Sequence, residues 1–331
     1  MRRREQEQLS RREWFRHAGV FAGGAIVANA LPGFAGPAVA GTHGWARAQA
    51  AADPLDERRA QMGAAPIQTT RLGASLVMLS GPGGNVVALH GPDGVVIVDT
   101  FVRPAWGGLK QALDGLGGGS LKLAIDTHWH FDHADNNDRA REAGAATLAH
   151  DNTRTRLTQS HDVLGMKFPP APAAALPTQT FSTTHTVYAN GETLQLAYVP
   201  PAHTDTDISI KFVTANVLHL GDLYFNGMYP FIDASTGGNI NGMVASADKA
   251  LTLADAQTKI VPGHGPLGDK AALTKYRDML VTSRDRVKKL KSSGQTLEQV
   301  VAAKPTADMD AVWGKGFMQP DFYVTIVYST L

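Results

Sequence analysis

The segment Thr127-His128-Trp129-His130-Phe131-Asp132-His133 contains four side chains that can bind a metal: His128, His130, Asp132 and His133. They directly follow residues 121–126, an apolar stretch that predicts a strand. Four such groups can converge on one place only if the chain turns sharply at the end of that strand. Imidazole nitrogen and carboxylate oxygen are ligands that Zn²⁺ takes when no thiolate is present. The segment therefore predicts a metal site.

Three further candidate ligands are His203, Asp222 and His264, and each follows an expected strand. Layered α/β folds place functional groups at the carboxyl ends of their strands, so these residues are in suitable places. Taken alone, His203 would be an ordinary polar residue, and Asp222 could simply cap the next segment. The glycines on both sides of His264 let the backbone turn close to a metal.

Strands and helices alternate along the chain, which predicts an α/β layered fold. The expected strands are 75–80, 85–90, 95–98, 121–126, 193–199, 208–213 and 217–220, and a further strand runs into the turn at His264. The expected helices are 109–116, 136–143, 244–253 and 271–291. The Pro- and Ala-rich residues 165–180 are expected to form a loop or a wall.

Composition narrows the class of protein. Hydrophobic residues make up 43% of the chain and charged residues 18%, which suits a globular protein with a substantial core. The formal charge of +1 gives no basic face for nucleic acid. The sequence has no Cys, which excludes disulfides, a thiol nucleophile and thiolate-bound zinc.

Residues 1–40 are predicted to be an export signal, with a basic start, an apolar Gly/Ala-rich middle and small residues before a cut. Ser10-Arg11-Arg12-Glu13-Trp14-Phe15-Arg16 resembles the twin-arginine signal, with Trp in the place of the usual Phe. Cleavage could follow Ala38-Val39-Ala40 or Ala46-Arg47-Ala48. A membrane anchor is the alternative, and Pro32 and Pro37 disfavour it.

Removing residues 1–40 takes away six Arg and three Glu, which leaves 25 basic and 27 acidic residues and a charge of −2. The basic character therefore belongs to the signal. The expected location is the periplasm or the outside of the cell. Because the twin-arginine route carries folded proteins, a metal could be loaded before export.

The order of the motifs resembles that of the metallo-β-lactamase superfamily. H-x-H-x-D-H is followed by a lone His, then Gly-Asp, then Pro-Gly-His-Gly, within residues 66–290. The resemblance implies a four-layer αβ/βα sandwich with two metals in a shallow cleft. By motif position, the first metal would be held by His128, His130 and His203, the second by Asp132, His133 and His264, and Asp222 would bridge them. Asp99 takes the place of a structural Asp of the superfamily.

The expected cofactor is a pair of divalent ions; zinc is expected, with iron and manganese as alternatives. Two cations about 3.5–4 Å apart need an anionic bridge and can share a hydroxide whose pKa they depress. That hydroxide would be the nucleophile, and the metals would polarise a substrate carbonyl. Asp132 would orient the nucleophile and could carry a proton.

The ligand at position 222 favours particular branches of the superfamily. True metallo-β-lactamases have Cys or Ser there, whereas Asp is more like the lactonase, glyoxalase II and phosphodiesterase branches. Homoserine-lactone lactonases place a Tyr three residues later, where this chain has Phe225. The nuclease branch adds a second domain and a basic surface, and the sulfatase branch adds further domains.

The sequence therefore predicts a zinc-dependent hydrolase of a small ester, lactone or amide. The alternatives are a β-lactamase and a non-catalytic zinc-binding protein. The expected partner is a small-molecule substrate, with no nucleic acid and no membrane after signal cleavage.

The predicted domains are a leader at 41–65, a catalytic domain at 66–290 and a C-terminal extension at 291–331 packed on it. Candidate substrate contacts are Tyr224, Phe225 and Tyr229, for which core packing is the default. His150 and His219 are expected to support the site or to pack in the core.

Overall fold

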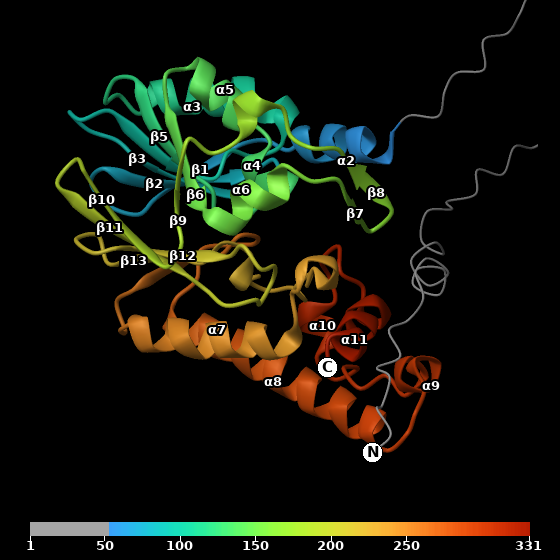
Figure 1. Ribbon diagram of the computed structural model, residues 1–331. Helices are drawn as coiled ribbons and strands as arrows, with labels where there is room; N and C mark the ends of the chain where they lie inside the picture. The colour runs from blue at the N-terminus through green and yellow to red at the C-terminus, as the bar shows by residue number, and fades with distance from the viewer. Residues whose placement is uncertain (1–52) are drawn as a thin grey trace, which may run out of the picture.

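The computed structural model describes residues 53–331 and has four layers, with two facing β-sheets each covered by helices on its outer side (Figure 1). Helices α3 (Trp106–Gly115) and α5 (Asn137–Glu142) cover the first sheet. Helices α7 (Ile240–Leu253) and α8 (Lys270–Ser292) cover the second. The expected αβ/βα sandwich is therefore confirmed.

The first sheet has seven strands in the order β1-β2-β3-β4-β5-β6-β9. Their bounds are β1 Gln68–Arg71, β2 Leu76–Gly81, β3 Gly84–Leu89, β4 Val95–Val98, β5 Leu121–Ile125, β6 Ala146–His150 and β9 Gln179–Phe181. Strands β1 to β4 pair antiparallel, and β4, β5, β6 and β9 pair parallel. The second sheet has the order β10-β11-β12-β13-β14, with bounds β10 Thr184–Ala189, β11 Glu192–Tyr198, β12 Ile208–Phe212, β13 Val217–His219 and β14 Lys259–Val261.

The remaining elements lie around the edges of the sandwich. The short hairpin of β7 (His161–Val163) and β8 (Met166–Phe168) forms a sheet of its own. The other helices are α2 (Pro54–Gly63), α4 (Phe131–Ala134), α6 (Asp151–Leu157), α9 (Leu297–Ala302), α10 (Asp310–Trp313) and α11 (Pro320–Ser329). No helix of residues 53–331 combines the length and the apolar character needed to cross a membrane.

Alternation of side chains along the strands builds three separate cores. In β2, Leu76 and Met78 face the second sheet, while Val77 and Leu79 face α3, because successive side chains of a strand point to opposite faces. A third core packs the aromatic segment 224–232 and helices α7, α8 and α11 together. Both faces of strands β2, β3 and β4 are thus buried, which explains why these strands are almost continuously apolar.

The expected strands and helices are present within a few residues of their predicted bounds. Other elements were not expected, namely the strands β1, β6, β7, β8, β9 and β10 and the helices α2, α4, α6, α9, α10 and α11. The expectation of a loose leader at 41–65 is wrong for its second half, because Asp53 caps a helix at Pro54–Gly63. The predicted signal at 1–40 lies outside the described residues.

The C-terminal residues 291–331 pack on the sandwich through α9 and α11, which contact α8. Tyr323, Val324 and Val327 of α11 belong to the same core as α7 and α8. The predicted C-terminal extension is therefore part of the main core.

Candidate metal centre

The seven predicted ligands lie together on the segments that follow four strands. His128 and His130 follow β5, and Asp132 and His133 lie on α4, which begins directly after them. His203 follows β11, Asp222 lies in a short 3-10 turn after β13, and His264 follows β14. One ligand atom from each forms two neighbouring groups: His128, His130, His203 and Asp222 in the first, and Asp132, His133 and His264 in the second.

In the first group, three imidazole nitrogens face one another. His130 Nδ1 lies 3.1 Å from His128 Nε2 and 2.9 Å from His203 Nε2. A tetrahedral ion with bonds of about 2.0–2.1 Å holds its ligand atoms about 3.3 Å apart, so this spacing fits a single cation.

The hydrogen bonds at the opposite ring nitrogens decide where the protons are. His203 Nδ1 donates to the carbonyl oxygen of Phe231 at 2.9 Å, and His130 Nε2 donates to Asp233 at 3.1 Å. Thr127 gives its hydroxyl proton to Asp99, so it accepts from His128 Nδ1 at 3.0 Å. All three facing nitrogens therefore present lone pairs to one another. Such an arrangement is repulsive by itself and becomes favourable around a cation.

The second group shares the Asp222 carboxylate with the first. Asp222 Oδ2 lies 3.4 Å from His203 Nε2 and 3.3 Å from His264 Nε2, and Asp222 Oδ1 lies 3.2 Å from His133 Nε2. Asp132 Oδ2 lies 3.4 Å from His264 Nε2. His133 Nε2 and Asp222 Oδ1 are buried and have no hydrogen-bond partner. Buried polar atoms normally have one, so both fit a bound ion.

Burial and the neighbouring charges shift the pKa values of the two groups in opposite directions. Burial lowers the pKa of His203 to about 4 and that of His128 well below its usual value. Burial also acts on His264, but the carboxylates of Asp222 and Asp132 outweigh it and raise its pKa to about 9. The imidazoles of His203 and His128 are thus neutral at pH 7, as ligands must be.

Asp99 and Asp233 hold the ligands from behind. Asp99 accepts from His133 Nδ1 at 2.8 Å and from the backbone N–H of Thr127 at 2.7 Å, and its backbone has the left-handed φ of 66°. Asp233 accepts from His130 and from the side chains of Ser235 and Thr236, and its N–H donates to the carbonyl of His203. Such partners fix the orientation of ligating imidazoles. The structural role predicted for Asp99 agrees with these contacts, whereas Asp233 was not identified from the sequence.

Asp207 organises the loop that carries His203. Its buried carboxylate accepts from the backbone N–H groups of His203 and Thr204 at 2.8 and 2.9 Å and from the Thr204 hydroxyl at 2.6 Å. Burial raises the pKa of Asp207 to about 7. The signal in the sequence was a His-Thr-x-x-Asp run after a strand, which resembles a capping turn.

The predicted substrate contacts Tyr224 and Tyr229 are wrong for this structure. Both are fully buried, Tyr224 beside Tyr276 and Tyr229 stacked on Tyr323 with ring centroids 4.2 Å apart. Phe225 is also buried, but its ring stacks on His264 at 5.1 Å and 12°. Phe225 therefore supports a predicted ligand from behind. His219 and His150 are buried as expected, and His150 stacks on Tyr198.

The predicted ligands differ in their access to solvent. His264 is 17% exposed and Asp132 12%, whereas the side chains of the others are at most 8% exposed. The centre therefore opens on the side of His264 and Asp132.

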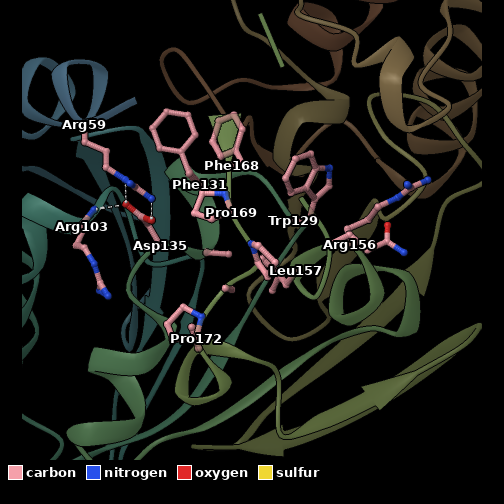
Figure 2. Close-up of a pocket in the computed structure, with 15 residues that line it drawn as sticks. Arg59, Arg103, Trp129, Phe131, Asp135, Arg156, Leu157, Phe168, Pro169 and Pro172 are labelled. Atoms are coloured by element: carbon pink, nitrogen blue, oxygen red, sulfur yellow. Dashed lines mark hydrogen bonds and ion pairs between the residues drawn. The ribbon is translucent and has the colours of Figure 1, made fainter. Parts of the chain in front are cut away.

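A small pocket lies beside the segment 128–133. Its volume is about 150 Å³, and it is lined by Trp129, Phe131 and Phe168 among others (Figure 2). None of the seven predicted ligands lines it. Its arginines are paired within the protein, for example Arg59 with Asp135 at 2.6 Å, so it offers no free cation.

The fold and the site together define a class: an αβ/βα sandwich with a cluster of histidine and aspartate at one edge of the two sheets. A sequence profile of the metallo-beta-lactamase superfamily matches residues 80–273. The chain belongs to this superfamily, and it is a superfamily hydrolase with a candidate site for the divalent metals that the superfamily typically binds.

Solved structures with the same fold are also similar to this chain. DIM-1 metallo-beta-lactamase is 19% identical with a TM-score of 0.54, and the match covers 66% of this chain and 98% of that one. A metallo-beta-lactamase from Pontibacter korlensis is 17% identical with a TM-score of 0.56, over 65% and 99% of the two chains. The sec-alkylsulfatase Pisa1 from Pseudomonas sp. is 15% identical with a TM-score of 0.62, over 79% of this chain and 50% of that one. At these identities the likeness concerns the fold. No curated protein matches the chain.

Proposed function

We propose that this protein is a zinc-dependent hydrolase that cleaves a small ester, lactone or amide. The observation that carries the proposal is the set of three imidazole nitrogens that face one another without protons. In each ring the proton is on the outer nitrogen, where it is donated to an oxygen atom of the protein. His128, His130 and His203 would hold one ion, Asp132, His133 and His264 the other, and Asp222 lies between the two groups. When bound, two divalent ions supply Lewis acidity toward a carbonyl and lower the pKa of water.

Side chains of this protein would orient the water molecule and accept its proton. Asp132 is the predicted catalytic residue, and the partial exposure of its carboxylate on the open side of the centre supports that role. Burial raises its pKa, but His133 and His264 outweigh that effect and lower it, so the group stays ionised near neutral pH. An ionised carboxylate there can orient a water molecule and accept its proton.

The first test is a substitution of the shared carboxylate. Asp222→Ala should lose about one metal ion per chain and at least about 10²-fold in turnover, because the carboxylate shared by the two groups no longer offsets the repulsion between the two cations. Elemental analysis of purified protein measures the metals, and the wild type should contain two. A wild type that holds one metal tightly and gains no activity with more would contradict the shared site.

The second test is a panel of chromogenic esters, lactones, thioesters, phosphodiesters, alkyl sulfates and cephalosporins. Neutral esters or lactones should be the best substrates of the zinc-loaded protein. Cephalosporins hydrolysed faster than any ester or lactone would favour a β-lactamase. No turnover in the entire panel would favour a non-catalytic zinc-binding protein.

We also propose export through the twin-arginine route, from the sequence of residues 1–40 alone. Arg11→Lys together with Arg12→Lys should keep the precursor in the cytoplasm, because the receptor of that route reads the arginine pair. Cell fractionation measures the distribution. Normal accumulation of the double variant outside the cytoplasm would contradict this route but not export itself.

A further inference from the structure

A groove of about 590 Å³ opens directly beside the candidate metal centre. His264 forms part of its lining, as do Gly83 and Gly84 from the turn between β2 and β3. That turn lies against the centre, since a Cβ added at Gly83 would come within 2.9 Å of Asp132 Cβ. The groove therefore begins on the side where the predicted ligands are most exposed.

The walls of the groove are apolar or neutral. Apolar surface comes from four side chains: Met62 at the end of α2, Met78 of β2, Met228 and Leu267. Uncharged polar groups come from Gln61, Gln68, Thr70, Ser80 and Asn85. The lining contains no Asp, Glu, Lys or Arg. Methionine side chains are flexible and polarizable, and they adapt to apolar groups of varied shape. No lysine or arginine of this lining is therefore available to pair with an anionic group.

The charges around the metal centre lead to the same conclusion. Asp132 and Asp222 lie among the predicted ligands, and Asp99 and Asp233 lie directly behind His133 and His130. These four carboxylates match the charge of two divalent ions. The centre would then have no excess positive charge with which to attract an anionic substrate.

We propose that the groove binds the alkyl chain of a neutral ester or lactone and that Met62 and Met228 determine the chain lengths the protein accepts. This inference rests on the proposed hydrolase function and narrows its substrate class. In the reaction, the oxygen of water bonds to the carbonyl carbon and the bond from that carbon to the alcohol oxygen breaks. The alcohol oxygen takes a proton from the water, and the products are an acid and an alcohol.

Binding of alkyl methyl ketones tests the groove without requiring turnover. Titration calorimetry on the zinc-loaded protein with 2-pentanone through 2-octanone should show affinity rising with chain length. Full burial of a methylene corresponds to about a fourfold gain. Hexyl sulfate carries the same hexyl chain as 2-octanone and should bind at least about tenfold more weakly than 2-octanone. Equal or tighter binding of hexyl sulfate would overturn the neutral-substrate inference.

Two methionine variants connect the chain-length dependence to the groove. Met62→Ala and Met228→Ala should each reduce the gain per methylene from about fourfold toward about twofold, because the chain loses part of its apolar contact. In the same two variants, turnover of 4-nitrophenyl octanoate should fall relative to turnover of 4-nitrophenyl acetate. Met309→Ala is the matched control, since Met309 is also partly buried but packs on the core away from the groove. If Met62→Ala and Met228→Ala leave the gain in ketone affinity per methylene unchanged, the proposed role of the groove is overturned.

The outcomes separate the two proposals. Chain-length-dependent ketone binding that the methionine variants weaken, without hydrolysis of any ester or lactone, would support the groove and contradict the proposed function. Hydrolysis of esters at rates that do not depend on chain length would support the proposed function and contradict the role of the groove. The alternative occupant that the test must exclude is the segment of this chain that precedes Asp53. Deleting residues 41–50 from the full chain would then tighten 2-octanone binding, and that result would also overturn the inference.

Discussion

At the scale of single residues, the candidate centre depends on the groups behind the ligands as much as on the ligands themselves. An imidazole can rotate and can carry its proton on either nitrogen. Each histidine of the first group has an oxygen atom at its outer nitrogen, from Thr127, Asp233 or Phe231. These oxygens keep the inner nitrogens unprotonated and pointed at one place.

Asp233→Asn should weaken metal binding at the first group. The variant keeps the shape of the side chain but removes the negative charge that holds His130, and a loss of about 10- to 100-fold in metal affinity is expected. Competition with a chromophoric chelator measures the affinity. Asp278→Asn is the control, because Asp278 is an exposed partner of Arg277. Equal affinities for the two variants would show that Asp233 does not support the site.

The ligands could be predicted from the sequence, whereas their supporting partners could not. His128, His130, Asp132 and His133 form a compact motif, and the other three ligands end recognisable strands. Asp233 contacts His130 across 103 residues of sequence and lies in a loop without periodicity. Tyr224 and Tyr229 lie near Asp222 in the sequence, yet they pack toward α8 and α11, and nearness in sequence does not show which way a side chain points.

At the scale of elements, the close approach of two turns places Asp222. The turn at Gly263 lies against the turn at Gly221, with the Gly263 N–H donating to the carbonyl of Gly221 at 2.7 Å. A Cβ added at Gly263 would lie 1.9 Å from Asp222 Oδ1. The shared carboxylate therefore has its position because residue 263 has no side chain.

Gly263→Ala should displace Asp222 and reproduce the loss of about one metal and at least about 10²-fold in turnover expected for Asp222→Ala. Overpacking of this kind also costs about 1–3 kcal/mol of stability. Elemental analysis and thermal unfolding measure the two effects. Gly107→Ala in α3 is the control, because its added Cβ meets no atom within 4 Å. Full metal content in Gly263→Ala would contradict the steric argument.

Two of the elements that were not expected, β1 and α2, have weak sequence signals. All four residues of β1 are exposed, so the strand lacks the alternation that marks a half-buried strand. Helix α2 buries Leu55 alone and is otherwise polar. Such elements form because neighbouring parts of the fold offer partners, as Arg59 of α2 finds Asp135 beside α4. Tertiary contacts of this kind cannot be seen in local periodicity.

At the scale of the whole molecule, residues beyond the superfamily match complete the core under the second sheet. Tyr323 of α11 is fully buried and stacks on Tyr229. Tyr323→Ala should therefore lower the free energy of unfolding by about 3–5 kcal/mol, as for other large core residues. Urea unfolding measures it. Val312→Ala, at a residue that is 60% exposed, should stay within about 0.5 kcal/mol of the wild type. Similar stabilities for both variants would mean that α11 is a peripheral addition.

Helix α2 joins the two ends of the described chain at the rim of the groove. Arg58 of α2 lies over the ring of Phe317, and Met62 on the same helix lines the groove together with Met228. Of these residues, the ribosome makes those of α2 first and Phe317 last. Every predicted ligand therefore leaves the ribosome before the ring that contacts Arg58, so the metal centre can form while this side of the rim still lacks that contact.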